Sequence, residues 1–129
     1  MPDDDAVRAY AAARKLAPDR YEPPALLGTL LARLVRFGEA APALADAIRL
    51  DPPRSELLEL VKRLGQCYQR LGKTNEAIAT WSGLVEKFPN DRRVRVELAE
   101  LLADEGLLGE AIERWEQVLA LAGQDLDQK

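Results

Sequence analysis

Apolar residues recur three or four positions apart through the middle of the chain, which is the spacing of one face of an α-helix. Between positions 57 and 71 the polar residues share the opposite face. Gly72 can take the positive φ that ends a helix, and Thr74 is placed to cap a second helix that runs until Pro89. Asn90 and Asp91 then supply a cap for the next one. The pattern predicts a pair of amphipathic helices separated by a short break.

The same pair of helices occurs three times, and its second helix occurs once more at the start of the chain. Alanine returns at intervals of 34, 37 and 34 residues, and a large apolar residue follows each alanine four positions later. The columns are Ala6 with Tyr10, Ala40 with Leu44, Ala77 with Trp81, and Ala111 with Trp115. A fixed period of this length is typical of a stacked repeat array and not of a catalytic domain with one pocket.

The repeat register predicts a single domain over residues 1–129 with about seven antiparallel helices. It divides into a half repeat at 3–20, a first complete repeat at 21–54, a second at 55–91 and a third at 92–125. The second repeat is three residues longer, and we expect either a longer connection or one extra helical turn there. The opening half repeat and the lack of a closing helix are typical of a fragment of a longer protein.

Small residues at one column of the first helices predict close helix packing. Each small residue would leave room for a large residue of the second helix, in the pairs Gly28 with Leu44, Gly65 with Trp81, and Ala99 with Trp115. Both tryptophans are therefore expected in the core. Val35 stands where the later repeats have Gly72 and Gly106, so the first repeat departs from its siblings at this helix end.

Composition and charge narrow the class of protein. Apolar residues make up 47% of the sequence and aromatic residues only 5%, so the core must consist mainly of Leu, Ala and Val, a mixture that favours helices. The net charge of −4 offers no basic excess for a phosphate backbone, which argues against nucleic acid as a partner. No stretch approaches the roughly 20 apolar residues of a membrane span, and the start is acidic. We therefore expect a soluble, cytoplasmic protein without membrane insertion.

The sequence offers little material for catalysis or cofactor binding. It contains no histidine, which is the usual general base and the commonest metal ligand. Its only cysteine, Cys67, lies on the apolar side of its helix and is expected to be a buried, inert thiol. No metal-ligand spacing, Gly-rich phosphate loop or nucleophile motif occurs. We expect no enzyme activity, no metal and no cofactor.

The repeat columns resemble the tetratricopeptide repeat (TPR) family, whose pattern places Leu-Gly and Tyr in a first helix and Ala, an aromatic residue and Pro in a second. The resemblance covers residues 3–125 and is strongest in the middle repeat, which has Val61, Leu64, Gly65, Tyr68, Ala77, Trp81 and Pro89 in place. It implies an all-α fold in which the helix pairs stack into a right-handed α-α superhelix, the TPR solenoid.

The resemblance also implies a concave surface, lined by the first helix of each pair, that binds peptide segments of other proteins. Carried over by position, this peptide-binding groove would contain Glu22, Ala25, Thr29, Arg33, Glu59, Lys62, Gln66, Gln69, Arg70, Arg93, Val96, Glu100 and Asp104. Its charges have both signs. The basic residues would hold acidic side chains or a terminal carboxylate of a ligand, while the acidic residues near the end of the array would favour a basic flank.

The main hypothesis is a non-catalytic scaffold that binds a peptide segment of a partner protein in this groove. The alternative is a structural self-assembly module, in which the uncovered last helix pair around Ile112 and Leu119 docks another copy or the rest of a longer parent chain. A third hypothesis is a targeting segment of a larger multidomain enzyme, whose chemistry lies in a domain outside this sequence.

Overall fold

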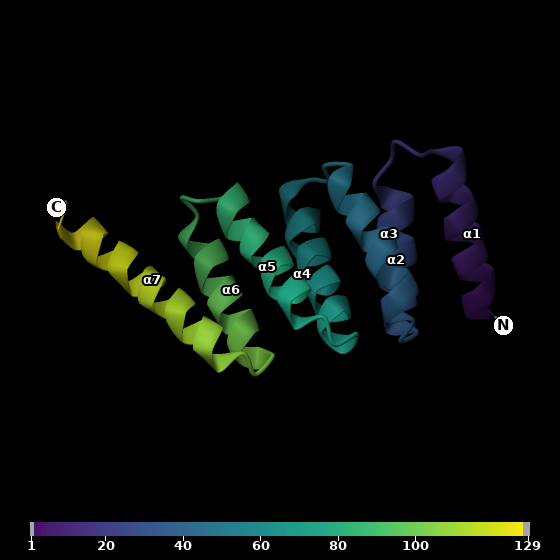
Figure 1. Cartoon of the computed structure of the whole chain (residues 1–129). Coiled ribbons are helices and arrows are strands. Elements are labelled where there is room, and N and C mark those ends of the chain that lie inside the picture. Colours follow the sequence, from purple (N-terminus) through teal and green to yellow (C-terminus); the bar gives the residue numbers. More distant parts are fainter. Residues whose placement is uncertain (1, 128–129) are drawn as a thin grey trace. The chain divides into compact units, whose positions relative to one another are not determined.

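The computed structural model describes residues 2–127, which form seven α-helices and no β-strand (Figure 1). The helices are α1 (Pro2–Leu16), α2 (Glu22–Arg33), α3 (Phe37–Arg49), α4 (Arg54–Arg70), α5 (Thr74–Lys87), α6 (Arg92–Asp104) and α7 (Leu108–Asp127). The predicted all-α fold and the predicted number of helices are confirmed.

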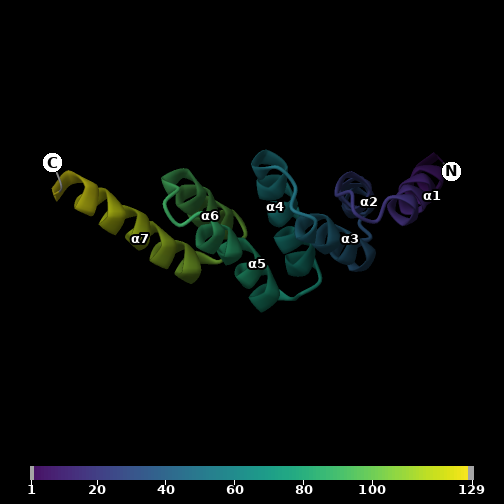
Figure 2. The ribbon, with the colours of Figure 1, turned by 90° about the horizontal axis from the view of Figure 1, so that it is seen from above.

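The chain divides into two compact units, and the boundary between Thr80 and Trp81 falls within α5. In the first unit α1 packs on α2, and α3 packs on both α2 and α4. Seen from above, α2 and α4 lie in one layer and α3 lies in another, and α2 also contacts α4 directly (Figure 2). In the second unit α6 packs along α7. In the first unit, α2 and α4, which are the first helices of their pairs, thus lie side by side over α3, which is the second helix of its pair.

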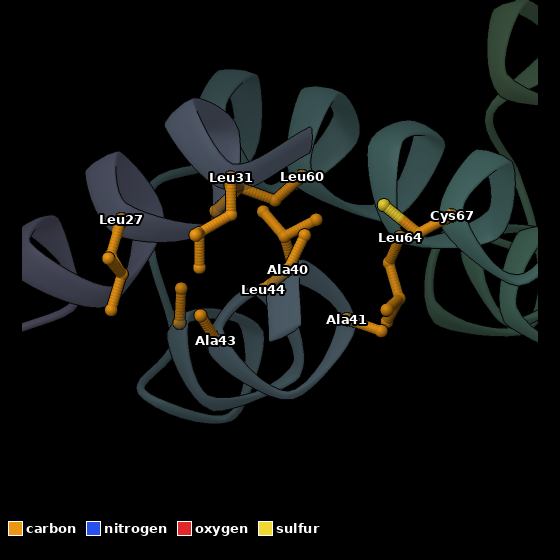
Figure 3. Close-up of a cluster of buried hydrophobic side chains, with 10 residues drawn as sticks. Leu27, Leu31, Ala40, Ala41, Ala43, Leu44, Leu60, Leu64 and Cys67 are labelled. Carbon is orange, nitrogen blue, oxygen red and sulfur yellow. The ribbon is translucent and has the colours of Figure 1, made fainter. Parts of the chain in front are cut away.

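The core of the first unit is a cluster of leucines and alanines at the meeting of α2, α3 and α4 (Figure 3). Leu27 and Leu31 extend from α2, Leu60 and Leu64 extend from α4, and the fully buried Leu44 of α3 lies between them. Burial of each such side chain contributes roughly 1.5–3 kcal/mol to folding. Because α3 is covered by α2 on one side and by α4 on the other, this helix joins the two first helices.

The predicted close approach of Gly28 to Leu44 is confirmed. A Cβ atom placed on Gly28 would lie 2.6 Å from Cγ and 2.8 Å from Cδ2 of Leu44, and 3.0 Å from the Leu44 backbone nitrogen. These separations are shorter than carbon atoms tolerate, and the backbone contact cannot be relieved by a rotamer change of Leu44. The small residue in this column therefore sets the distance between α2 and α3. The other two proposed pairs, Gly65 with Trp81 and Ala99 with Trp115, remain predictions.

The first helices α2, α4 and α6 end in the same conformation. The second residue after the end of each helix has a positive φ, which is 63° at Val35, 76° at Gly72 and 79° at Gly106. The next residue along the chain then donates its N–H to a carbonyl five positions back, with N···O distances of 2.8, 2.8 and 2.9 Å. Glycine usually occupies the positive-φ position because a Cβ is unfavourable there. Val35 adopts the same backbone as its glycine siblings and is strained.

The helix bounds bear on two further expectations from the sequence. The helix α4 has 17 residues, against 12 in α2 and 13 in α6, so the extra residues of the middle repeat form one additional turn at its start. Asp91 caps α6, since its Oδ1 accepts a hydrogen bond from the Val94 backbone N–H at 3.2 Å.

The expectation that both tryptophans are buried is half right: Trp81 is fully buried, but Trp115 is 36% exposed. Trp115 lies on α7, and one side of this helix is not covered by any described residue.

Substituting Gly28 with alanine should lower the free energy of unfolding by about 1–3 kcal/mol, because the added Cβ overlaps Leu44 and the backbone of α3. Denaturant unfolding measures the change. Gly38→Ala is the matched control, since nothing lies within 4 Å of a Cβ at Gly38, and there the free energy should stay unchanged or rise by up to about 1 kcal/mol. Equal effects of the two substitutions would show that α2 and α3 do not pack as closely as described.

Substituting Val35 with glycine should raise the free energy of unfolding by about 0.5–1.5 kcal/mol, because it removes a β-branched side chain from the left-handed region. The same denaturant titration tests it. Val35→Ala separates conformation from surface hydrophobicity, since it removes most of a side chain that is 69% exposed but keeps the strained Cβ. A gain from alanine as large as that from glycine would contradict the conformational explanation.

Candidate functional site

The helices α2 and α4 run in the same direction (Figure 1). Side chains of both helices line two hollows on the first unit. We call them the N-terminal hollow and the C-terminal hollow, after the ends of the helices at which they lie, and together the α2–α4 groove. Each wall is a row of residues three or four positions apart. Such rows arise because the opposite faces of both helices bury their leucines in the core.

The N-terminal hollow has a volume of about 390 Å3 and an apolar floor. Leu26, which is 50% exposed, and the buried Leu60 form this floor, and acidic side chains stand at its rim. Ser55 donates a hydrogen bond from Oγ to Oε2 of Glu56 at 2.8 Å, which helps to orient this carboxylate. The full lining comprises Ala25, Leu26, Thr29, Ser55, Glu56, Glu59, Leu60 and Arg63.

The C-terminal hollow has a volume of about 250 Å3 and a basic rim. It is lined by Ala32, Arg33, Phe37, Arg63, Gln66, Cys67 and Arg70. Arg63 borders both hollows, so they are two parts of one groove. Within the described part of the chain, neither Arg33 nor Arg63 pairs with a carboxylate. These two guanidinium groups are therefore available to an anionic group of a ligand.

The charges of the α2–α4 groove change sign along its length. Glu22 and Glu56 stand in the first turns of their helices, and Arg33 and Arg70 stand in the last turns. This placement is favourable for each helix alone, because the N-terminus carries partial positive charge and the C-terminus partial negative charge. Since α2 and α4 run in parallel, however, the like-charged ends also lie together. The groove consequently has one acidic and one basic end.

Neighbouring ions tune the acidic end. Arg20 binds Glu22 through two hydrogen bonds, at 2.8 and 3.3 Å, and this partner holds the pKa of Glu22 below its usual value. Partial burial raises the pKa of Tyr21, and the nearby Glu56 raises it further. Lys62 lies 3.9 Å from Glu59 in a partly exposed pair, which contributes little energy. A lowered pKa keeps the Glu22 carboxylate ionised at neutral pH.

The thiol of Cys67 lies beneath the C-terminal hollow, as part of the core. Burial raises the pKa of Cys67, and the nearby Arg63 guanidinium opposes this rise without reversing it. A thiol with a raised pKa is a poor nucleophile at neutral pH, because the thiolate is the reactive form. The expected buried and inert cysteine is what the structure shows, and Cys67 acts as a small apolar residue here.

The structure brings some of the sequence-predicted groove residues together and leaves others apart. Those that line the α2–α4 groove are Ala25, Thr29, Arg33, Glu59, Gln66 and Arg70. Glu22 lies one turn beyond Ala25, in its ion pair with Arg20. Lys62 and Gln69 lie on another side of α4 and do not line either hollow. The Oε1 atom of Gln69 is buried and accepts no hydrogen bond from the described residues.

Arg63 is the charged groove residue, common to both hollows, that sequence reasoning missed. It lies seven residues after Glu56 and seven before Arg70, so it shares their side of α4. The signal was present in this spacing, because Glu56, Glu59, Arg63, Gln66 and Arg70 follow each other at intervals of three and four residues. Leu26 was missed because an apolar residue on an amphipathic helix is ordinarily assigned to the core.

The second unit holds the remaining predicted groove residues on α6. Arg93, Glu100 and Asp104 are exposed and Val96 is half-buried, and their spacing places them along one side of that helix. The residues proposed for assembly, Ile112 and Leu119, lie on α7 and are 57% and 68% exposed. Whether any of these residues binds a partner remains a prediction.

A third hollow, of about 390 Å3, lies where the ends of α1 and α3 meet the start of α2. Its charges are largely satisfied within the fold. Asp46 pairs with Arg14 of α1 and, at 2.9 Å, with Arg49 of its own helix. The basic residues also stand in the last turns of α1 and α3, where they complement the helix ends. This cluster therefore has a structural explanation as the contact that holds α1 against α3.

Two further properties limit the chemistry that the described residues offer. Among residues 2–127, no group of three or more His, Cys, Asp or Glu side chains has an arrangement that could hold a metal ion. In the same range, no helix combines the length and the apolar character needed to cross a lipid bilayer. What the first unit does offer is a groove with an apolar floor and two charged ends.

Solved structures share this fold. A crystal structure of MamA aligns with a TM-score of 0.67 and 20% identity, covering 97% of this chain and 71% of that chain. YrrB, described as a TPR protein with an unusual peptide-binding site, aligns with a TM-score of 0.64 and 23% identity, covering 91% of this chain and 59% of that chain. At these identities the likeness shows a common fold.

Sequence comparison with curated proteins gave no significant match. The sequence profile of the tetratricopeptide repeat family, in contrast, matches residues 4–55 and 62–125. These segments include nearly all of the repeat columns, from Ala6 to Trp115. The chain therefore belongs to the tetratricopeptide repeat family.

Proposed function

We propose that this protein is a non-catalytic scaffold that binds an extended peptide segment of a partner protein in the α2–α4 groove. The observation that carries the proposal is that the N-terminal and C-terminal hollows share Arg63 and form one groove between parallel helices. Family membership supports it, because TPR proteins are generally interaction scaffolds without catalysis. YrrB, which has a similar fold and is described as peptide-binding, gives further support.

The chemistry of the groove defines the peptide that fits it. An apolar side chain would lie on the floor made by Leu26 and Leu60. A basic side chain of the peptide would approach Glu56 and Glu59 at the acidic end. Acidic side chains, or a terminal carboxylate, would approach the arginines at the basic end, where bidentate hydrogen bonds to a carboxylate are favourable. The charge gradient thus fixes the direction in which the peptide lies.

The groove is better suited to a peptide than to a compact small molecule. Its two hollows are open on the surface and follow the helices for more than two turns, from Ala25 to Arg33 on α2 and from Ser55 to Arg70 on α4. An extended chain can place successive side chains along such a row. The acidic and the basic end of the groove can then each bind a different side chain of the peptide. The remaining predicted positions, including Lys62 and Gln69, would serve a ligand that reaches beyond this groove.

Reversing the charge of Arg63 should weaken peptide binding by about tenfold, because this guanidinium borders both hollows and has no carboxylate partner among the described residues. Peptides selected from a displayed random library on the complete chain serve as probes, and fluorescence anisotropy measures their dissociation constants. Lys73→Glu is the matched control, because this substitution makes the same change of charge at an exposed residue that lines neither hollow. Equal losses for Arg63→Glu and Lys73→Glu would reduce the effect to net charge and contradict the groove.

Replacing Leu26 with aspartate should abolish most of the affinity for the same peptides, because it places a carboxylate on the apolar floor of the N-terminal hollow. The fold should be unaffected, since the side chain is already 50% exposed. Leu16→Asp is the control at an apolar residue that is 86% exposed and lies outside the groove. Circular dichroism checks folding, and unchanged binding by the folded Leu26→Asp variant would exclude this floor as the ligand site.

A further inference from the structure

Four apolar side chains of α7 form an exposed row that the α2–α4 groove does not involve. Leu108, Ile112, Trp115 and Leu119 follow each other at intervals of four, three and four residues and are 62%, 57%, 36% and 68% exposed. We call this row the α7 stripe. Single exposed leucines are common on protein surfaces, but four large apolar residues along one side of one helix are not. The stripe has the spacing of a helix-packing surface.

The first unit shows what packs on such a stripe. The alanine column aligns Ala40 of α3 with Ala111 of α7, so the α7 stripe corresponds in α3 to Phe37, Ala41, Leu44 and Ile48. In α3, Ala41 and Leu44 belong to the core cluster, and Phe37 and Ile48 pack against it. The cluster includes Leu60, Leu64 and Cys67 of α4, and α3 packs on α4 as well as on α2 (Figure 3). The same register is therefore covered in α3 by an antiparallel amphipathic helix. In α7 it is uncovered among the described residues.

The charges beside the α7 stripe select among helices that could cover it. Glu113 and Glu116 are exposed on α7, and Glu116 lies one turn from Ile112 along the open edge of the stripe. The only basic residue of α7, Arg114, is directed elsewhere and donates hydrogen bonds to Ser82 at 3.0 Å and Gln117 at 3.2 Å. The open edge is therefore acidic, and a basic flank on the covering helix would complement it.

We infer that the α7 stripe is a second docking surface, whose partner is an amphipathic helix of another protein with a leucine-rich face and basic residues beside it. Leucines of the partner would cover Ile112 and Leu119, and its Lys or Arg side chains would approach Glu113 and Glu116. A second copy of this chain fits less well. Antiparallel two-fold pairing of identical α7 helices places the same edge of each helix against itself, so the acidic side chains would face one another.

The helix α4 supplies a probe with this chemistry. A peptide with the sequence of residues 54–70 has the leucines that cover α3, and its four basic residues outnumber its two acidic ones. It should bind the complete chain saturably, as measured by fluorescence anisotropy. Binding should also shift the emission of Trp115 to shorter wavelength, because this indole leaves water while Trp81 is already buried. A scrambled peptide of equal composition should not bind.

Substitutions in the stripe decide whether this binding occurs there. Ile112→Glu combined with Leu119→Glu should weaken peptide binding at least about tenfold, while Leu16→Glu at an exposed residue of α1 should not. Glu113→Lys combined with Glu116→Lys should weaken it by repulsion, and the loss should diminish in high salt. All substituted positions are exposed, and circular dichroism confirms the fold of each variant.

Three results would overturn the inference. Failure of the 54–70 peptide to bind the complete chain is one. Equal binding to the stripe variant is another, because it would place the peptide on α3 or in the groove. A concentration-dependent dimer of the unliganded chain that Ile112→Glu abolishes is the third, because the second copy would then be the occupant; sedimentation equilibrium measures it.

Discussion

No helix of this chain buries its apolar face alone, and the rest of the structure depends on that constraint. In the first unit α1, α2, α3 and α4 each pack on a neighbour along the chain, and α2 also contacts α4. In the second unit α6 packs on α7. The distance between layers is fixed where a small residue meets a large one, as at Gly28 and Leu44. Because the contacts within each unit join helices that are close in sequence, each unit is built from similar interfaces, and the same column has the same role wherever a neighbour is present.

Much of the fold follows from the sequence because that role repeats. The register of alanine and large apolar residues is enough to predict seven helices, and Gly72 and Gly106 mark helix ends at positive φ. Val35 shows that the backbone of such an end is set by the fold and not only by glycine. The exposure of Trp115 was missed because its column is the same as that of the buried Trp81, although the repeat register left the last helix pair without a covering helix. The burial of a side chain depends on a neighbouring helix that covers it, and the residue's position in the repeat does not show whether that helix is present.

The candidate site was predictable only in part, and for a related reason. Positions carried over from a family pattern identify the helices that line a groove, but not the side of each helix that faces the next. Arg63 lines both hollows although no family position indicates it, whereas Lys62, its neighbour in sequence, lines neither. One residue on a helix is a rotation of about 100°, so a list derived from position can include a residue and miss the next. Contact between α2 and α4 decides which one is right.

The groove and the α7 stripe differ in the physical origin of the affinity that they can offer. In the groove, helix ends of like charge are gathered by parallel packing, so its selectivity is electrostatic and should weaken with salt. On the α7 stripe, the dominant contribution is burial of Leu108, Ile112, Trp115 and Leu119, and salt would act only through the acidic edge. The basic end of the groove, which favours acidic side chains of a ligand, is a feature that the α7 stripe with its acidic edge does not share. As proposed, the two surfaces would bind their partners at separate sites.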